Sequence, residues 1–304
     1  MMVLRSLPES GNGSEYLDMS QARTAGNDYV IWGRTRRTEF AHYPDALSIR
    51  AAWGGRKHCD VNGRAVAVDD DNFLILNAGT RCSMHIDSVY PVESLTICFR
   101  PGLVNALEQS LEYGSDASGP GAGFVENLQP HDTLVSPVLR FIRAHLARGL
   151  VDEWWYEEQL LFLLERMHLG RRKLLQHVEA LDFIRPATRR EACRRIALAT
   201  DYLHTHYAHK VSLAGLARVA CLSKFHFLRL FTSIHGVTPH AYLQRKRANV
   251  AVRLLQSTRA SVSEVAASVG FAFESTMLRQ VRRCTQLSPR ELRSRAAATF
   301  AITA

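Results

Sequence analysis

Two groups of side chains in the C-terminal third of the chain have residue types suited to contacting nucleic-acid bases. They are Ser223, Lys224, Phe225, Leu228 and Arg229 in the first group, and Glu274, Ser275, Leu278 and Arg279 in the second. An arginine can bond guanine O6 and N7 together, a carboxylate can accept from cytosine N4, and an apolar side chain can contact the thymine methyl group. We therefore expect Arg229 to read a guanine, Leu228 to meet a thymine methyl and Glu274 to favour a cytosine.

The two groups belong to an internal repeat. Arg229 and Arg279 lie 50 residues apart, and Pro239 and Pro289 have the same separation. A repeat of this kind defines the architecture of the region that contains it. Residues 217 and 266, both alanine, lie only 49 apart. The second copy therefore has one extra residue in its turn.

Each copy has the pattern of a helix, a sharp turn and a second helix. Apolar residues recur at helical spacing before the turn: Leu216, Ala217 and Ala220 in the first copy, and Val262, Val265, Ala266 and Val269 in the second. Gly270 stands where the chain must turn, and glycine tolerates a positive φ there. Cys221, also small, holds the matching position. Because a second helix with a polar, basic outer face is the element that enters a major groove, we predict helix-turn-helix units over about 213–233 and 262–284.

Capping residues indicate where these helices begin. Ser212 can cap the first short helix, and Ser261 with Glu264 forms a capping box before the third. A threonine followed by proline predicts the start of a helix over about 239–256. Such a helix of about 18 residues spans ~27 Å. It could hold two recognition helices about one DNA turn, ~34 Å, apart.

Residues about 190–297 resemble the C-terminal domain of AraC-type (arabinose-operon regulator-like) transcription factors. The matching stretches are 223–231, 236–243 and 265–271, together with Ser275, Arg279, Ser288 and Pro289. In the second copy, Met277 and Val281 stand where the family usually has Phe, and Gln286 stands where it usually has Gly. The resemblance implies a double-stranded DNA partner, either a promoter or an operator. It also implies activation by contact with RNA polymerase as the commoner behaviour, although repression remains an alternative.

The charge of the chain is unevenly distributed. The net charge is +9, but residues 188–304 hold 19 basic and 5 acidic residues, which leaves residues 1–187 at −5. This asymmetry places the surface that binds a polyanion in the C-terminal region. Phosphate contacts supply much of the affinity of DNA-binding proteins. Among the basic residues outside the central stripe of each recognition helix, we expect some of Lys246, Arg282 and Arg283 to hold phosphates.

The N-terminal half has a β pattern. Asn62-Gly63 between two extended runs is a strong hairpin signal, and residues 66–68, 73–76 and 95–99 have the composition of short strands. Many short strands with regular turns suggest a sandwich or barrel, and the resemblance implies a cupin-like barrel. The predicted class is α+β: a cupin-like β-barrel with helices, followed by an all-α domain with two helix-turn-helix motifs joined by a long helix.

Three domains or segments follow from these patterns. Residues 1–130 are expected to form the effector-sensing domain, 131–187 a helical segment, and 188–304 the DNA-binding domain. Within the segment, apolar stripes predict helices over 135–146, 152–169 and 174–183, with a loop over 113–123 before them. These stripes serve either as domain core or as the interface of a homodimer, since effector domains of this family often pair through helices.

Two kinds of site in the N-terminal half remain open. His58, Cys59, Cys82 and His85 could supply four ligands to zinc, which leads to the alternative of a metal-dependent cupin enzyme fused to a DNA-binding module. The main expectation is instead a barrel that binds a small-molecule effector, with no metal, no cofactor and no catalytic group. Trp53, Phe73, His85 and Phe99 are candidates for its walls, but no ligand-binding residue is assigned. A third alternative is a ligand-free architectural protein.

The apolar runs and the cysteines of the chain bear on its cellular compartment. The chain shows no signal peptide and no run of about 18 apolar residues, so no membrane association is expected. Its 6 cysteines form no CxxC pair, which favours reduced thiols in the cytoplasm. We therefore predict a cytoplasmic transcription regulator and not an enzyme.

Overall fold

The computed structural model describes residues 2–4, 27–40, 46–112, 123–150, 152–179 and 186–295. The chain divides into two compact units, Met1–Pro186 and Ala187–Ala304, and each is described by itself. Among the described helices, none combines the length and apolar character that crossing a bilayer requires.

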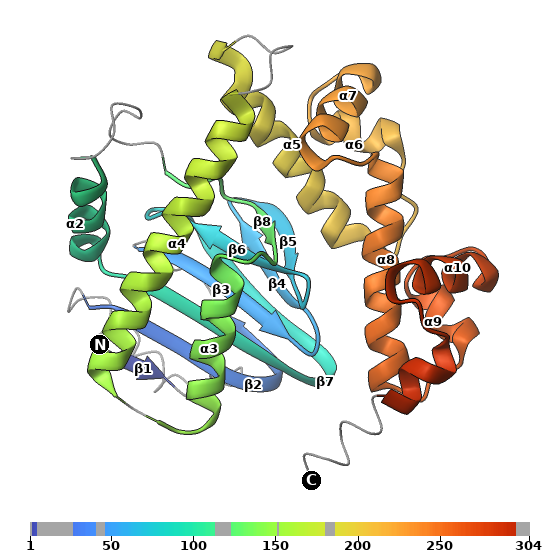
Figure 1. The fold of residues 1–304 in the computed structure, drawn as a ribbon, viewed down its shortest axis with the longest axis horizontal. Helices are drawn as coiled ribbons and strands as arrows, with labels where there is room; N and C mark the ends of the chain where they lie inside the picture. The colour runs from blue at the N-terminus through green and yellow to red at the C-terminus, as the bar shows by residue number, and fades with distance from the viewer. Residues whose placement is uncertain are drawn as a thin grey trace. The chain divides into compact units, whose positions relative to one another are not determined.

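The first unit combines a sheet with three described helices. The strands are β1 (Met2–Leu4), β2 (Tyr29–Phe40), β3 (Leu47–Trp53), β4 (Lys57–Val61), β5 (Arg64–Val68), β6 (Asn72–Leu76), β7 (Cys82–Phe99) and β8 (Leu128–Pro130). The helices are α2 (Pro101–Glu112), α3 (Val135–Ala147) and α4 (Glu153–Glu179). Helices α3 and α4 lie across one face of the sheet (Figure 1).

The long strand β7 organises the sheet. The described strands follow the order β1-β2-β7-β3-β6-β8, and β4 pairs with both β5 and β7. All of these pairings are antiparallel except that of β1 with β2. The last part of β7 pairs with β3, whereas its first part pairs with β4. This branching folds the β4–β5 hairpin over one face, which gives a nearly closed barrel.

Alternation along the strands separates two hydrophobic cores. On β6, Phe73 and Ile75 pack with the helices, whereas Leu74 and Leu76 join the core inside the barrel. Successive side chains of a strand point to opposite faces, so β2, β3, β6 and β7 contribute to both cores. Most of the residues that the helices cover are large and apolar, while the barrel interior also contains polar and charged groups.

Several local predictions are confirmed. Asn62 and Gly63 have φ angles of 52° and 81° and connect β4 to β5, as a hairpin turn with two left-handed residues requires. The expected strands over 66–68, 73–76 and 95–99 lie in β5, β6 and β7. Of the expected loop over 113–123, residues 113–122 lie outside the described part of the chain.

The helical segment differs from its prediction in one respect. Two helices were expected over 152–169 and 174–183, but α4 continues without a break through Gly170 to Glu179. A Cβ at Gly170 would meet no atom within 4 Å, so this glycine marks no close contact. A single glycine costs a helix only about 1 kcal/mol, which the buried residues of α4 offset. Residues 180–183 lie outside the described ranges.

The second unit is helical throughout its described part. Its elements are α5 (Pro186–His206), α6 (Leu213–Val219), α7 (Lys224–His235), α8 (Pro239–Ser257), α9 (Val262–Ser268) and α10 (Glu274–Thr285). The long helix α8 carries the α6–α7 pair near one end and the α9–α10 pair near the other (Figure 1). The predicted class is confirmed: a cupin-like β-barrel with helices is followed by an all-α region with two helix-turn-helix motifs.

Candidate nucleic-acid interface

The first recognition helix, α7, is positioned by a capped start and an apolar inner face. The Oγ atom of Ser223 accepts a hydrogen bond from the His226 amide at 3.3 Å, which satisfies one of the free N–H groups of the first turn. Phe227, Leu230 and Phe231 on the inner face are buried. Burial of a Phe or Leu side chain contributes roughly 1.5–3 kcal/mol, so this face determines which side of α7 remains outside.

The outer face of α7 carries the residues expected to read DNA. Lys224, Phe225, Leu228 and Arg229 are all exposed, and Phe225 is 79% exposed. Removing a phenylalanine side chain from water would be favourable, so an aromatic ring held outward on a helix suggests a contact surface. The four side chains share the exterior of one helix, in agreement with the stripe derived from their spacing.

The second recognition helix, α10, repeats this arrangement with weaker local support. Glu274, Ser275 and Arg279 are exposed and Leu278 is half-buried. Met277 and Val281 are buried in place of the two phenylalanines of α7. The N-cap position of α10 is Phe273, whose side chain makes no capping hydrogen bond.

The turns of the two units confirm the repeat in detail. The first turn, residues 220–223, is one residue shorter than the second, 269–273. Cys221 and Gly270 occupy matching positions with φ angles of 51° and 86°. The Ser212 side chain accepts from the Gly215 amide at 3.0 Å, and the capping box of Ser261 and Glu264 is formed in both directions.

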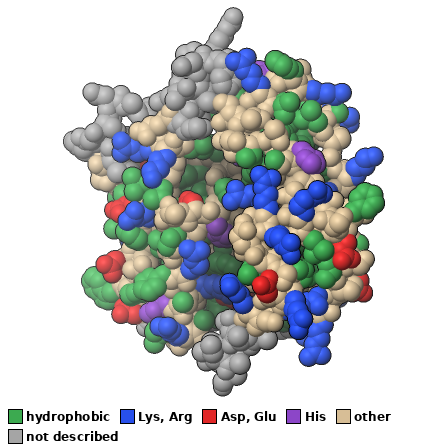
Figure 2. Space-filling model, turned by 45° about the vertical axis from the view of Figure 1, so that its right-hand side comes forward, with side chains coloured by type: hydrophobic (Ala, Val, Ile, Leu, Met, Phe, Trp, Pro, Cys, Tyr) green, Lys and Arg blue, Asp and Glu red, His purple; other side chains and the backbone are tan. Residues whose placement is uncertain are grey.

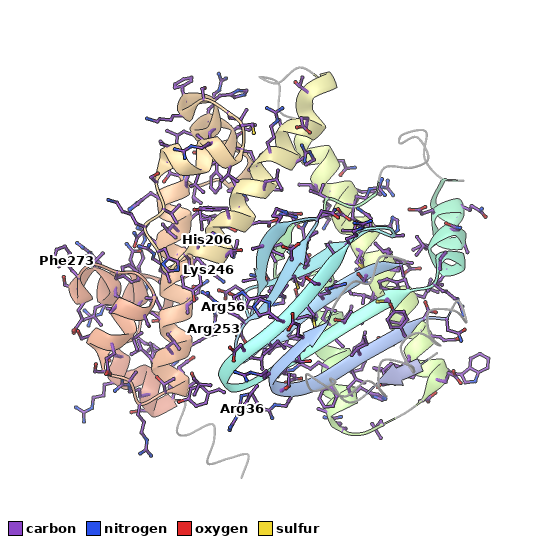
Figure 3. The ribbon with its side chains drawn as sticks, turned by 180° about the vertical axis from the view of Figure 1, so that it is seen from behind. Arg36, Arg56, His206, Lys246, Arg253 and Phe273 are labelled. Carbon is purple, nitrogen blue, oxygen red and sulfur yellow. The ribbon has the colours of Figure 1, made fainter. Side chains whose placement is uncertain are left out.

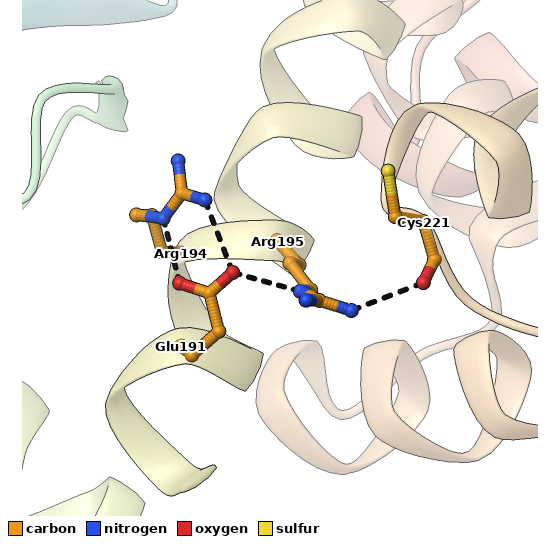
Figure 4. A network of polar contacts seen from close by, with 4 residues as sticks. All are labelled: Glu191, Arg194, Arg195 and Cys221. Atoms are coloured by element: carbon orange, nitrogen blue, oxygen red, sulfur yellow. Dashed lines mark hydrogen bonds and ion pairs between the residues drawn. The ribbon is translucent and has the colours of Figure 1, made fainter.

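Helix α5 supports the first turn through a polar network (Figure 4). Arg195 donates from Nη1 to the backbone oxygen of Cys221 at 3.1 Å and from Nε to Glu191 at 2.8 Å. Arg194 also donates to the Glu191 carboxylate, at 2.8 and 3.0 Å. These bonds from Arg194 and Arg195 lower the pKa of the Glu191 carboxyl to about 2. The network therefore holds the turn before α7 through the carbonyl group of Cys221.

The linker helix α8 begins as predicted and extends one residue beyond the expected end. The Thr238 hydroxyl accepts from the Ala241 amide at 3.3 Å, with proline at the first helical position. Arg247 on α8 donates from Nε to the Tyr207 carbonyl at 2.7 Å and from Nη2 to the His209 carbonyl at 2.8 Å. The segment that follows α5 is thereby fastened to α8.

Lys246 is the one expected DNA contact that the structure places inside the protein. Its side chain is 3% exposed, and Nζ lies 5.4 Å from the centroid of the Tyr207 ring. The residue is labelled on α8 in Figure 3. A phosphate contact requires a solvent-facing ammonium group, so this expectation is corrected. Arg282 and Arg283 are exposed on α10, as a phosphate role requires.

Phe273 is a surface residue that the sequence pattern did not single out. It is 71% exposed at the start of α10 and projects away from the neighbouring helices (Figure 3). The repeat aligns Phe273 with Ser223, which is polar. A comparison of the two copies therefore did not indicate an exposed aromatic residue at this position. Its signal in the sequence was an aromatic residue at a helix start, where serine or threonine is usual.

The charged surface agrees with a polyanion partner. On the right-hand side of Figure 2, Lys and Arg side chains are spread widely and Asp and Glu side chains are few. The exposed arginines of α7 and α10 belong to the C-terminal region that holds the excess positive charge.

The N-terminal barrel does not form the metal site that the enzyme alternative requires. His58 and His85 face each other across β4 and β7 with stacked rings, 5.0 Å between centroids. Cys59 and Cys82 are buried in the interior core instead. Adjacent strand residues point to opposite faces, so the two histidines and the two cysteines cannot converge. Within the described part of the chain, no group of three or more His, Cys, Asp or Glu side chains could hold a metal ion.

The residues proposed as barrel walls also lie elsewhere. Trp53, Phe73 and Phe99 belong to the core between the sheet and the helices, and His85 is exposed. Their positions follow from the alternation of the strands, which sequence describes, and from the side on which the helices pack, which it does not.

The two helix pairs joined by α8, α6–α7 and α9–α10, define a helix-turn-helix protein. Comparisons with known proteins agree. The family described as "Helix-turn-helix domain" matches residues 216–295. The chain is 26% identical to the probable transcriptional regulator LumQ of Photobacterium leiognathi over 206 residues, 65% of this chain and 82% of LumQ. It is 26% identical to the regulator AlkR of Acinetobacter baylyi over 204 residues, 60% of this chain and 67% of AlkR.

A third relative is similar over a shorter stretch. The arabinose operon regulatory protein of Escherichia coli is 30% identical over 101 residues, which cover 33% of this chain and 35% of that protein. The C-terminal domain is thus similar to that of the arabinose operon regulatory protein, in agreement with the resemblance seen in its sequence.

Proposed function

We propose that the protein is a transcription regulator that reads two neighbouring major-groove segments of a promoter or operator. The observation that supports this function is the arrangement of α7 and α10, which present exposed arginines at matching positions and are joined by α8. With 19 residues, α8 is about 28 Å long, close to the ~34 Å of one DNA turn. A single chain can thus address two half-sites. The DNA-contacting residues are proposed to be those of the two exposed stripes, with Arg282 and Arg283 on phosphates.

Selection of bound sequences from random double-stranded DNA tests this function. The full chain is expected to recover two short elements with centres about 10 base pairs apart. Arg279→Ala should blur one element and Arg229→Ala the other. Recovery of a single element, or of none above the starting pool, would contradict the two-segment arrangement.

The N-terminal barrel is proposed to sense a small-molecule effector, and RNA polymerase is proposed as the partner of the DNA-bound protein. We place the protein in the cytoplasm, where promoters of this kind are read. No described feature favours an enzyme over a regulator, because the ligands of the metal-dependent alternative point to opposite faces of their strands.

A homodimer is proposed through the outer face of α4. Trp154 is 85% exposed, and Leu161, Phe162 and Leu169 are also exposed. Trp154 and Leu161 lie seven residues apart, as do Phe162 and Leu169, so they form an apolar stripe along one side of the helix. Phe141 on α3 is exposed too. Contiguous exposed apolar residues of this kind are typical of protein interfaces.

Replacing Trp154 and Leu161 together by glutamate should therefore shift the protein from dimer to monomer. The measurement is the molar mass by light scattering after size-exclusion chromatography. Gln109→Glu, at an exposed position of α2, provides a control that adds charge without touching the stripe. A monomeric parent protein, or a dimeric double variant, would exclude this interface.

A further inference from the structure

Two cations lie inside the barrel. Arg50 is 3% exposed and Lys57 is fully buried. On β3, Ile49 and Ala51 pack toward the helices, so Arg50 between them points into the interior. Lys57 begins β4 two residues before Cys59, which belongs to the interior core. The two side chains lie close enough for Arg50 to lower the pKa of Lys57.

The hydrogen bonds of these two cations within the described part of the chain reach hydroxyl groups and cysteine sulfurs, and the sulfurs include that of Cys59. Lys57 donates from Nζ to Ser94 Oγ at 3.0 Å and to Thr96 Oγ1 at 2.8 Å. Arg50 donates from Nη1 to the Cys82 sulfur at 2.8 Å, and sulfur is a weak acceptor. Among the described residues, the buried Arg50 Nε has no hydrogen-bond partner.

The ionisable groups that act most strongly on Arg50 and Lys57 include no carboxylate. They are the two cations and the thiols of Cys59, Cys82 and Cys98. Burial, with a smaller contribution from Arg50, lowers the pKa of Lys57 to about 8, although the thiols act in the opposite direction. A hydrogen bond from Cys82, together with the two cations, lowers the pKa of the Cys59 thiol. A Cys59 thiolate would balance one of the two positive charges and leave the other without a counter-ion.

An uncompensated buried charge is costly, and charged groups inside proteins are normally paired. We propose that the barrel interior binds a small monocarboxylate with an apolar body, whose carboxylate lies between Arg50 and Lys57. The inference deepens the proposed effector-sensing function by naming the chemical class of the effector. A single negative charge matches the charge that the thiolate leaves unbalanced.

The surroundings of the two cations favour a carboxylate over other anions. The guanidinium group can donate two parallel hydrogen bonds to a carboxylate, and Arg50 Nε is available for one of them. The interior also holds apolar side chains that could contact the body of the ligand, among them Val66, Val68, Leu74 and Ile86. An inorganic phosphate would bring more charge than the site balances and would leave these walls without contacts.

Isothermal titration calorimetry of the full chain tests the proposal, with sodium benzoate and sodium butyrate as probes. Benzamide serves as the neutral counterpart of benzoate, and inorganic phosphate as the competing anion. Both carboxylates should give a saturable heat that benzamide and phosphate do not give. Arg50→Met and Lys57→Met should each weaken benzoate binding about tenfold or more, as expected for the removal of a hydrogen bond to a charged group. Arg36→Met, at an exposed position of β2 (Figure 3), should leave binding unchanged.

A second readout needs no variant. A carboxylate beside Lys57 favours its charged form, so benzoate binding at about pH 8–9 should take up protons. Titrations in buffers of different ionisation enthalpy measure this uptake. Cys59, Cys82, Cys98 and Arg50 face Lys57 and also contribute, so Lys57→Met identifies the share of the lysine.

Three results would overturn the anion site: equal binding of benzamide and benzoate, tighter binding of phosphate, or no saturable heat with either carboxylate. None of these results would affect the DNA-binding function, which the random-sequence selection tests independently. Urea unfolding of Arg50→Met and Lys57→Met, followed by circular dichroism, shows whether the barrel is folded, because operator binding reports on the second unit alone.

Discussion

At the scale of single residues, Arg229 carries the sharpest expectation about DNA. It is exposed on α7 beside Leu228, and an arginine bonded to guanine O6 and N7 discriminates against other bases by roughly 1–3 kcal/mol. Arg229→Ala should relax the preference at one base pair and leave non-specific binding nearly intact. Competition binding with single-base operator variants measures this. An equal loss on all sequences would make Arg229 a phosphate contact.

The matching variant Arg279→Ala is expected to cost less specific affinity. Met277 and Val281 give α10 a smaller buried face than the phenylalanines give α7, and the N-cap of α10 lacks a side-chain hydrogen bond. A recognition helix that is held less firmly loses more entropy when it docks. Arg218→Ala on the exterior of α6 is the control. A larger loss from Arg279→Ala would reverse the ranking of the two copies.

His235 links a single side chain to stability against acid. Its Nε2 lies 3.0 Å from Thr200 Oγ1, which joins α7 to α5, and burial lowers its pKa to about 4. The unfolded chain therefore binds a proton that the folded state excludes between about pH 6.5 and 4. Stability contributed by the neutral imidazole is complete above pH 6.5 and is lost as the pH falls toward 4.

The consequence is a free energy of unfolding that decreases by up to about 1.4 kcal/mol per pH unit in this window. Urea unfolding followed by circular dichroism at several pH values measures it. His235→Gln should remove this part of the pH dependence, whereas His226→Gln, at an exposed position of α7, should retain it. An identical pH dependence in both variants would assign the effect to other groups.

At the scale of elements, the two turns differ in what they tolerate. Gly270 has a φ of 86°, and a Cβ there would lie 2.4 Å from the Ala208 carbonyl oxygen. Gly270→Ala must therefore move backbone, and we expect a loss of more than about 2 kcal/mol of stability, above the ~1–2 kcal/mol of the left-handed conformation alone. Cys221 already has a positive φ of 51°, so Cys221→Gly should be neutral or stabilise by up to about 1 kcal/mol.

Chemical denaturation of the two variants beside the parent protein provides the comparison. If the unfolding midpoint of Gly270→Ala lay at the same urea concentration as that of the parent protein, the close approach to Ala208 would not exist in solution. The same experiment examines the junction between α5 and the second helix-turn-helix unit, since Ala208 follows α5 directly.

At the scale of the whole molecule, the uneven charge predicts a strong dependence of DNA binding on salt. Removing the side chain that holds one phosphate should reduce the steepness of log K against log salt by about 0.9. Arg282→Gln and Arg283→Gln are expected to do so. Lys246→Gln should leave the slope unchanged, because Lys246 is buried beside Tyr207. Fluorescence anisotropy at several salt concentrations gives the slopes, and an unchanged slope for both arginine variants would show that neither residue holds a phosphate.

The sequence by itself determined the helix-turn-helix units. Their caps, turns and apolar faces, such as Ser261 with Glu264 or the positive φ of Gly270, depend on residues within a few positions of one another. Interactions of this range are visible in local spacing, and the 50-residue repeat presented them twice. The same reasoning located the hairpin at Asn62 and Gly63.

Only the tertiary structure decided which face of each element is covered. Strand alternation separates Arg50 from Ile49, but the positions of α3 and α4 determine that Arg50 lies inside the barrel. Lys246 is a lysine on a helix, where a surface position is expected, yet the segment after α5 packs over it. In both cases the deciding interactions join residues far apart in the chain, and a local pattern holds no information about such partners. The buried pair of Arg50 and Lys57 therefore became visible only when the strands were brought together.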